Sequence, residues 1–589
     1  MVTQPQIIPS QPRTTLRVTL DNDNVLEGPI GTPVGDFLEV AHAMQPYEAP
    51  LMGAIVDGHL RELSYALQRD AAIEPVLLNS SDGGRIYRRT LVFLMTTAAS
   101  ELWPGCRVSV RYAVPDGGYY CTRLDADPFT EAELEQLADR MREIVASDDP
   151  ISKRTVPLEE AAALFAERHE DDKVRLLEQR SRQHLTLYTL RGWSDYYYGY
   201  MLPSTGHLHL FRLIDVEKGF ILQYPRRESV NELLTLEAYN KLSQVFNQAD
   251  DWLRRMDVED VGRLNRIVKD QNRIHELILV AEALHEQHIA QIAHDISQKH
   301  QHQGVRLVLI AGPSSSGKTT FAKRLAIQLL AHGLRPFTLE LDNYFVDRER
   351  TPRDEDGDYN FEALEAINLP LFNEQLLRLI RGQTVTLPRF DFLTGKSLPG
   401  RQARLQENQL IVIEGIHGLN PRLVPQIPEE MIYRVYVSAL TQLNIDGHNR
   451  VPTTDVRLLR RIVRDADHRG YSATQTLERW GSVRRGEKEN IFPYQENADA
   501  MFNSALVYEL AALRPLAEPL LLQVEPNTPP HIEAKRLLSF LGWVQPLLPT
   551  QLEMVPDTSL LREFVGHSSL EGYHPLIGSD DPADDRNGV

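Results

Sequence analysis

Apolar residues in the second half of the chain follow two alternating spacings. A continuous β-branched run covers residues 305–311, and Phe321, Leu325 and Leu329 then recur every four residues. Continuous runs are typical of strands buried on both faces, whereas a four-residue spacing indicates a helix. Further apolar runs predict strands at 336–341, 410–413 and 433–437. Strands and helices that alternate in this way indicate a doubly wound α/β domain with a parallel sheet.

The first part of the chain has a different pattern. β-like runs cover residues 16–20 and 54–56, and the second run ends at the turn dipeptide Asp57-Gly58. Short strands joined by such turns predict a small β-rich module over residues 14–79.

Residues 226–303 have the pattern of connecting helices. Apolar positions recur at steps of three or four, at Leu277, Ala281, Leu284, and Ile292, with His288 between them. The segment also holds His285, His288, His294, His300 and His302. Positions nine apart lie on opposite faces of a helix, so structural zinc is disfavoured and solvated histidines are expected.

A phosphate-loop sequence lies between the first predicted strand of the α/β domain and its helix. It reads Gly312-Pro313-Ser314-Ser315-Ser316-Gly317-Lys318-Thr319 and fits G-x-x-x-x-G-K-[ST] at every fixed position. Lys318 would reach the β- and γ-phosphates, and the Thr319 hydroxyl can hold Mg²⁺. The alternative is a Gly/Ser-rich connection without function. The strand before it and the helix after it favour an ATP site that extends to Thr320.

Two carboxylates follow predicted strands. Asp342 ends the run 336–341, and Glu414 ends the run 410–413. The carboxyl ends of parallel strands meet at one edge of a sheet, so both side chains are expected near Lys318 and Thr319. One carboxylate can accept the proton of an acceptor hydroxyl, and the other can support Mg²⁺.

Four arginines share one face of a predicted helix: Arg457, Arg460, Arg461 and Arg464. No acidic residue lies between positions 456 and 464, so helical neighbours cannot neutralise the stripe. A solvated stripe is the alternative. We favour a lid that presents guanidinium groups to the transferring phosphates, with Arg484-Arg485-Gly486 as part of the same cover.

Composition and charge narrow the class of protein. The 589 residues exceed what one core supports, and no apolar run reaches the roughly 18 residues that a bilayer requires. Residues 1–13 do not resemble a secretion signal, and Cys106 and Cys121 are the only cysteines. We therefore expect a cytoplasmic protein without membrane contact. The net charge of −19 excludes a globally basic nucleic-acid binder but leaves a local RNA-binding patch open.

Residues 304–542 resemble the uridine kinase and phosphoribulokinase family at five separated places. Besides the phosphate loop, these are Leu341-Asp342-Asn343-Tyr344-Phe345, Tyr359-Asn360-Phe361-Glu362, Leu387-Pro388-Arg389-Phe390-Asp391-Phe392 and the segment 457–470. The resemblance implies ATP-dependent phosphorylation of a hydroxyl, with Asp342 as the base and Mg²⁺ bridging the phosphates. Together with the phosphate loop and the strand-end carboxylates, it predicts an acceptor site built from Asp342, Tyr344, Glu362 and Phe390. The same residues predict a metal site of Thr319, Glu414 and Asp342, and catalytic roles for Asp342, Lys318, Arg457, Arg461 and Arg464.

Two positions depart from the uridine kinase pattern. Where those enzymes carry a tyrosine and a histidine that recognise the pyrimidine, this chain has Phe390 and Gly395. Phe390 can stack on a ring but offers no hydroxyl, and Gly395 would leave space for a larger base or an added methyl group. We therefore expect uridine to be a poor acceptor, with thymidine the first nucleoside to test.

The N-terminal segments resemble two domains of threonyl-tRNA synthetases. Residues 14–79 resemble the TGS domain, through Thr32-Pro33-Val34, Ile55-Val56-Asp57-Gly58 and Arg61-Glu62-Leu63. Residues 85–225 resemble the editing domain, through Val114-Pro115-Asp116-Gly117-Gly118-Tyr119-Tyr120, Pro128-Phe129-Thr130 and Pro203-Ser204-Thr205-Gly206.

The hydrolytic residues of that editing domain are replaced. Its His-x-x-x-His and Cys-x-x-x-His positions align with Arg89, Phe93, Tyr197 and Met201. This set cannot supply the same ligand or acid–base chemistry, so hydrolysis is not expected. Nearby aromatic residues could stack bases, although packing is the favoured interpretation: Trp193, Tyr196, Tyr197, Tyr198 and Tyr200.

Together these patterns predict a multidomain α+β and α/β chain. The expected segments are 1–13 disordered, 14–79 TGS-like, 85–225 editing-like, 226–303 helical connector, 304–542 kinase-like and 543–589 a C-terminal tail with an acidic, disordered stretch at 579–585. The first functional hypothesis is a kinase that uses ATP and Mg²⁺ to phosphorylate a small-molecule hydroxyl, most simply on a nucleoside. The second is an RNA- or ribosome-associated ATPase. The oligomeric state stays open.

Overall fold

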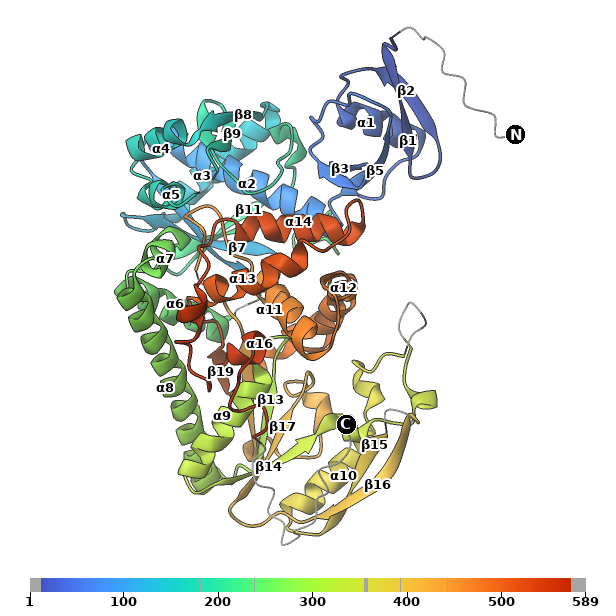
Figure 1. The fold of residues 1–589 in the computed structure, drawn as a ribbon, viewed down its shortest axis with the longest axis vertical. Coiled ribbons are helices and arrows are strands. Elements are labelled where there is room, and N and C mark those ends of the chain that lie inside the picture. The colour runs from blue at the N-terminus through green and yellow to red at the C-terminus, as the bar shows by residue number, and fades with distance from the viewer. Residues whose placement is uncertain are drawn as a thin grey trace, which may run out of the picture. The chain divides into compact units, whose positions relative to one another are not determined.

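The computed structural model describes residues 12–180, 182–237, 239–353, 357, 359–391, 394–441 and 443–573 (Figure 1). The chain divides into two compact units, and each combines three separate stretches of sequence. Unit 1 consists of residues 1–237, 445–450 and 525–540, and unit 2 of residues 238–444, 451–524 and 541–589. The division therefore does not follow the order of the chain.

Unit 1 begins with a five-stranded sheet in the order β2-β1-β5-β3-β4. Its elements are β1 (Thr15–Leu20), β2 (Val25–Pro29), α1 (Val34–Met44), β3 (Leu51–Val56), β4 (His59–Arg61) and β5 (Ala71–Leu77). Leu16 and Val18 of β1 share a core with Phe37 of α1. Asp57 and Gly58 both adopt positive φ between β3 and β4, as the predicted turn requires.

A larger α+β part of unit 1 follows. Its four-stranded antiparallel sheet has the order β11-β12-β7-β6, and its three-stranded sheet has the order β10-β9-β8. The strands are β6 (Arg107–Val114), β7 (Gly118–Leu124), β8 (Ser152–Pro157), β9 (His184–Leu190), β10 (Trp193–Asp195), β11 (Arg212–Val216) and β12 (Gly219–Gln223). The helices are α2 (Ser81–Leu102), α3 (Glu131–Ala146), α4 (Leu158–Glu167) and α5 (Asp171–Leu177). Helix α3 begins at a capping box of Thr130 and Glu133.

Two later stretches complete unit 1. Residues 445–450 bring Asp446 to the hydroxyl of Tyr196, which donates a hydrogen bond to it, and Asn449 Nδ2 donates to the Tyr196 carbonyl over 3.3 Å. Most of α14 (Pro529–Leu541) forms the other stretch, and its Glu533 pairs with Arg85 at 2.9 Å. Buried polar groups of unit 1 thus depend on partners from late in the chain.

Unit 2 is built on a five-stranded, all-parallel sheet in the order β14-β17-β13-β18-β19. The strands are β13 (Leu307–Ala311), β14 (Arg335–Glu340), β17 (Gln409–Glu414), β18 (Ile432–Ser438) and β19 (Ala500–Asn503). Leu307 and Leu309 lie in one apolar cluster, and Val308 and Ile310 lie in another. The sheet is therefore buried on both faces, as its continuous apolar runs predict.

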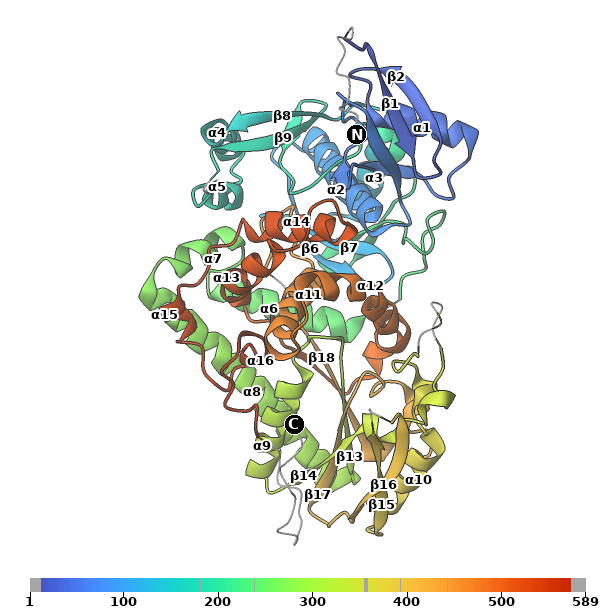
Figure 2. The same ribbon diagram turned by 45° about the vertical axis from the view of Figure 1, so that its right-hand side comes forward.

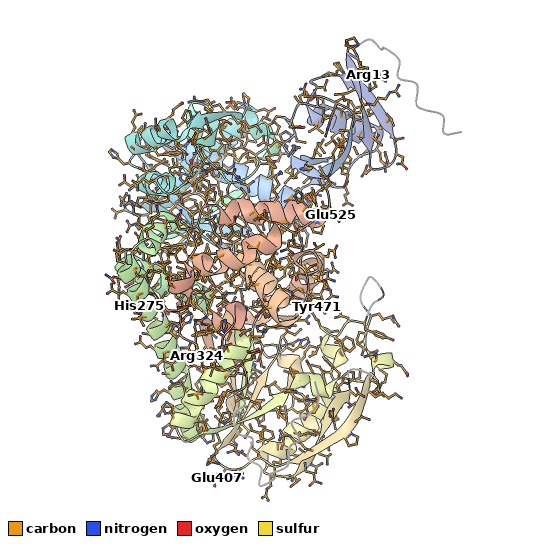
Figure 3. All side chains as sticks on the ribbon, viewed as in Figure 1. Arg13, His275, Arg324, Glu407, Tyr471 and Glu525 are labelled. Carbon is orange, nitrogen blue, oxygen red and sulfur yellow. The ribbon has the colours of Figure 1, made fainter. Side chains whose placement is uncertain are left out.

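The rest of unit 2 is largely helical. Its helices are α6 (Asn240–Arg255), α7 (Val261–Val268), α8 (Gln271–Gln303), α9 (Lys318–Ala331), α10 (Leu369–Ile380), α11 (Thr453–His468), α12 (Ala473–Asn490), α13 (Glu509–Leu521), α15 (Pro549–Leu552) and α16 (Arg562–Val565). The long helix α8 runs beside α9 in both views, and Arg324 of α9 pairs with Glu286 of α8 at 2.6 Å (Figures 2 and 3). A separate hairpin joins β15 (Val385–Asp391) to β16 (Lys396–Ala403).

The ends of the chain differ from expectation where they are described. Residues 543–573 are folded rather than a loose tail, since Leu560, Leu561 and Phe564 are fully buried. The acidic stretch 579–585 and nearly all of 1–13 lie outside the described residues. No helix among the described residues is both long enough and apolar enough to cross a membrane.

Candidate active site

The phosphate loop lies at the carboxyl end of β13 and leads into α9. Gly312 is required there because a Cβ at this position would lie 1.9 Å from the Val437 carbonyl oxygen. Gly317 adopts φ +83°, in the left-handed region that favours glycine. Lys318 folds back over the loop and donates a hydrogen bond to the Pro313 carbonyl over 3.1 Å. The sequence therefore forms the strand–loop–helix arrangement that phosphate binding needs.

The two residues proposed to hold Mg²⁺ contact each other. Thr319 Oγ1 donates to Glu414 Oε1 over 3.0 Å, because β17 ends beside the start of α9. Burial raises the pKa of Glu414, and the charge of Lys318 works against this shift. One hydroxyl and one carboxylate oxygen at the phosphate loop are ligands of the kind that Mg²⁺ prefers, so these residues fit the ion.

Asp342 lies on the same edge of the sheet. It belongs to a short 3₁₀ helix, Leu341–Tyr344, that directly follows β14, whose Glu340 pairs in register with Glu414. The surrounding protein desolvates the carboxyl and raises the pKa of Asp342, and the charge of Glu340 adds to the shift. Asp342 is nevertheless exposed to solvent. A carboxyl with a raised pKa that stays accessible is suited to accept a proton.

The predicted arginine stripe lies on α11 but is not an open cationic surface. Arg457 and Arg460 are 1% and 0% exposed, and each is paired with a carboxylate from another helix. Arg461 and Arg464 both pair with Asp465, at 3.2 and 3.0 Å. The acids that neutralise the stripe thus lie just beyond the window 456–464 or far away in sequence.

Three of these arginines reach the phosphate loop. Arg457 and Arg460 donate to the carbonyl oxygens of Ser314 and Ser315, over 3.2 and 3.4 Å. Arg461 Nη1 donates to Ser314 Oγ over 2.7 Å. Desolvation lowers the pKa of Lys318 of the loop, and the charge of Arg464 contributes to this lowering.

Glu487 of α12 is a site residue that the sequence did not reveal. It accepts from the backbone N–H of Ser314 over 2.9 Å and from Arg457 Nη2 over 2.8 Å. Burial opposes its ionisation, but Arg457 and then Arg484 lower the pKa of Glu487, so it is a carboxylate. Its neighbours in sequence form an ordinary charged helix, and no local signal distinguishes it from them.

The proposed acceptor residues are only partly brought together. Glu362 is exposed and lies against Gly486 of α12. Partial desolvation raises the pKa of Glu362, the charge of Glu487 raises it further, and the charge of Arg461 opposes the shift. Tyr344 is 2% exposed, and its hydroxyl donates to Gln375 Oε1 over 2.9 Å. The hydroxyl of Tyr344 therefore belongs to the core rather than to an open acceptor site.

Phe390 lies in an aromatic cluster with Phe345 and Phe361, at ring-centre distances of 5.6 and 6.5 Å. It is only 4% exposed. The expected free space at Gly395 is absent, because a side chain there would meet Arg348 within 2.8 Å and the glycine has φ +70°. Phe392 lies outside the described residues.

The four positions of the lost hydrolytic set come together in unit 1. The rings of Phe93 and Tyr197 pack edge to face at 5.5 Å, and Met201 Sδ accepts from Thr90 over 3.9 Å. Arg89 donates to the Tyr200 carbonyl over 2.6 Å. Apolar packing and a hydrogen-bonded guanidinium thus occupy this part of the domain.

The aromatic residues around it are also interior. Tyr196 and Tyr197 are 0% and 6% exposed, and Tyr198 donates to the Arg450 carbonyl over 2.5 Å. Trp193 is covered by the guanidinium of Arg168, 3.7 Å from its ring centre. This favours packing over base stacking.

The connector histidines differ from the prediction that they are solvated, because His285 is buried. His285 is 6% exposed, and burial followed by the charge of Arg324 lowers its pKa to about 3. It is therefore a neutral core residue. Among the described residues, no group of three or more potential metal ligands is placed to hold an ion.

The chain is similar to known proteins in two separate regions. Residues 307–511 match the Phosphoribulokinase / Uridine kinase family, so this part of the chain has a kinase fold of that family. The match begins at β13 and ends within α13, and it includes the phosphate loop, Asp342, Glu414 and the α11 arginines.

Particular relatives match a different region, the N-terminal part of the chain. The threonine–tRNA ligase of Anaeromyxobacter dehalogenans is 33% identical over 212 residues, which cover 35% of this chain and 32% of that enzyme. The threonine–tRNA ligase of Burkholderia lata is 30% identical over 239 residues, 40% of this chain and 35% of that enzyme. The chain spans about a third of the length of these relatives. The D-glycerate 3-kinase of Cryptococcus neoformans overlaps at 16% identity and a TM-score of 0.26, over 36% of this chain and 89% of its own, which is too low to carry an argument.

Proposed function

We propose that unit 2 transfers the γ-phosphoryl group of ATP to a hydroxyl of a small molecule, and that the acceptor is a nucleoside. The observation that carries the proposal is the arrangement at one sheet edge. There the phosphate loop, the contact between Thr319 and Glu414, and the accessible carboxyl of Asp342 follow three strands of one parallel sheet. A phosphate site, a metal site and a proton acceptor are the three parts that phosphoryl transfer requires.

In the proposed reaction the acceptor oxygen attacks the γ-phosphorus, the bond to the β–γ bridging oxygen breaks, and ADP leaves. Asp342 accepts the hydroxyl proton. Lys318 holds the β- and γ-phosphates, and Arg461 and Arg464 offset the charge that spreads over the transferring oxygens. Mg²⁺, when bound by Thr319 and Glu414, neutralises charge on the same phosphates, with Asp342 a further candidate ligand.

A nucleoside is the proposed acceptor because the site combines rings with a carboxylate. Phe345 and Phe390 are buried, but Phe361, which packs on both, is partly exposed and can contact a planar base, and the exposed Glu362 can accept hydrogen bonds from sugar hydroxyls. The sequence favours thymidine because Gly395 is expected to leave space for a methyl group, but Arg348 fills that space, so thymidine is no longer preferred over other nucleosides. The choice of base is therefore left to the screen.

The test is a γ-phosphate transfer screen across nucleosides and sugar alcohols, with Lys318→Ala protein as the matched control. We expect one nucleoside to be phosphorylated with kcat/KM above about 10⁴ M⁻¹s⁻¹, and no transfer by the control. A sugar alcohol as the best acceptor would retain the kinase but overturn the nucleoside. ATP hydrolysis without transfer to any acceptor would overturn the proposal.

A second candidate function is an RNA-associated ATPase. Its support is the similarity of about a third of the chain to threonine–tRNA ligases. RNA that copurifies with the full-length protein and is released at high salt would favour it, because phosphate contacts weaken as counterions compete. Protein free of RNA at low salt would exclude it.

A further inference from the structure

The C-terminal segment of unit 2 lies on the phosphate loop. We call residues 559–571, which include α16, the C-terminal strap. In Figures 1 and 2 α16 lies beside α11, and the two helices are in contact. The strap is held at both ends. Ser559 Oγ donates to Glu282 of α8 over 2.5 Å, and Lys323 of α9 donates to the Leu570 and Glu571 carbonyls over 2.7 and 2.9 Å.

Glu563 of the strap occupies hydrogen-bond donors that a nucleotide would use. Its carboxylate accepts from the backbone N–H of Thr320 over 3.2 Å and from Thr320 Oγ1 over 2.8 Å. Thr320 is in the first turn of α9, where backbone amides bind the phosphates nearest the nucleoside. The Glu563 charge also acts on Lys318 and Glu414. An anion from the protein itself thus sits at the phosphate-binding turn.

The residues on either side of Glu563 anchor the strap. Phe564, the next residue, places its ring 4.9 Å from the Arg460 guanidinium and is fully buried. Leu560 lies so close to Gly317 that a Cβ there would be 2.2 Å from Leu560 Cδ2. These two apolar side chains thus hold the strap in the core beside the phosphate loop and keep the Glu563 carboxylate at Thr320.

We infer that the strap is an internal competitor for the ATP phosphates, in which the Glu563 carboxylate must leave Thr320 before ATP binds productively. This inference rests on the proposed ATP site but not on the identity of the acceptor. Only the side chain of Glu563 has to move, because Leu560 and Phe564 stay packed in the core. The free protein therefore holds its phosphate site in a neutralised, lower-affinity state.

The test measures ATP binding to full-length protein by calorimetry. Glu563→Ala, and the isosteric Glu563→Gln if the alanine variant is unstable, should tighten ATP and ADP binding about tenfold, because a charged competitor is removed. Adenosine, which has no phosphate, should bind equally well to wild type and variant. Glu553→Ala is the matched control, since Glu553 is an exposed acid in the segment just before the strap, and it should leave ATP affinity unchanged.

Three outcomes would contradict the inference. Unchanged or weaker ATP binding by both Glu563 variants would make Glu563 a structural or nucleotide-supporting residue. An equal change for ATP and adenosine would show that the whole pocket was altered rather than its phosphate part. Absence of ATP binding to wild type and variants alike would overturn the proposed function and this inference with it.

Discussion

At the scale of single residues, the two charged groups proposed for catalysis have separable roles. Lys318 contacts the phosphate loop itself, whereas Asp342 is exposed in the short 3₁₀ helix that follows β14. We expect Lys318→Ala to lose productive ATP binding. We expect Asp342→Asn to keep ATP affinity but to lose at least about a hundredfold in transfer, since it removes the base and leaves the phosphate contacts. Calorimetry and steady-state kinetics measure both. Equal loss of ATP affinity in the two variants would assign Asp342 to metal binding.

A second residue-scale prediction concerns Glu533 in unit 1. Burial alone would raise its pKa, but the guanidinium groups of Arg536 and Arg85 lower the pKa of Glu533 from 4.5 to about 2. A carboxyl whose pKa is lower in the folded state stabilises that state at pH values above the pKa of the unfolded state. This stabilisation is lost as the pH falls from 4.5 to 2. The shift corresponds to up to about 3 kcal/mol.

Glu533→Gln should therefore lower stability at pH 7 and flatten its decline between pH 4.5 and 2. Urea unfolding at several pH values measures this. Glu525→Gln, an exposed acid in the same late stretch of unit 1 (Figure 3), is the control and should change neither. Parallel pH profiles for wild type and Glu533→Gln would show that the ion pair contributes nothing.

At the scale of elements, a buried ion pair joins α11 to α13. Arg460 Nε donates to Glu509 Oε2 over 2.7 Å, and both side chains are at most 2% exposed. Glu509→Gln leaves the guanidinium buried without a counter-charge and should cost about 3 to 5 kcal/mol in the free energy of unfolding. Glu518→Gln, in the half-exposed pair with Arg514 on the same helix, should cost under about 1 kcal/mol. Equal losses in denaturant titrations would contradict this.

The elements were predictable where local pattern decides them. The predicted strand 336–341 is shifted by one residue from β14. The predicted strands 410–413 and 433–437 fall inside β17 and β18. β19 has only four residues, too few for a recognisable run, and was missed. Ion pairs between residues far apart in the sequence could not be predicted either, because nothing in the sequence near Arg457 indicates that Glu487 neutralises it. The phosphate loop was readable because its chemistry is local, and the acceptor residues were not, since core packing decides whether Tyr344 or Phe390 is accessible.

At the scale of the whole molecule, unit 1 should not carry the hydrolytic chemistry of the ligases it resembles. Phe93, Tyr197 and Met201 pack together where that chemistry would need metal ligands or acid–base groups. We expect the full-length protein to bind no stoichiometric zinc and to leave seryl-tRNA intact. Metal analysis and a deacylation assay, with a threonine–tRNA ligase as positive control, measure this. One zinc per chain or measurable deacylation would contradict it.

The late stretches that complete unit 1 also determine when it can finish folding during synthesis. Domains usually fold from the N-terminus as they leave the ribosome. Here the buried hydroxyl of Tyr196 lacks its acceptor Asp446, and Arg85 has Asp82 but lacks its second partner Glu533, until those residues are made. The first domain to emerge therefore lacks these late partners until most of the polypeptide has been made. A premature stop before residue 525 thus yields a chain in which neither unit is complete.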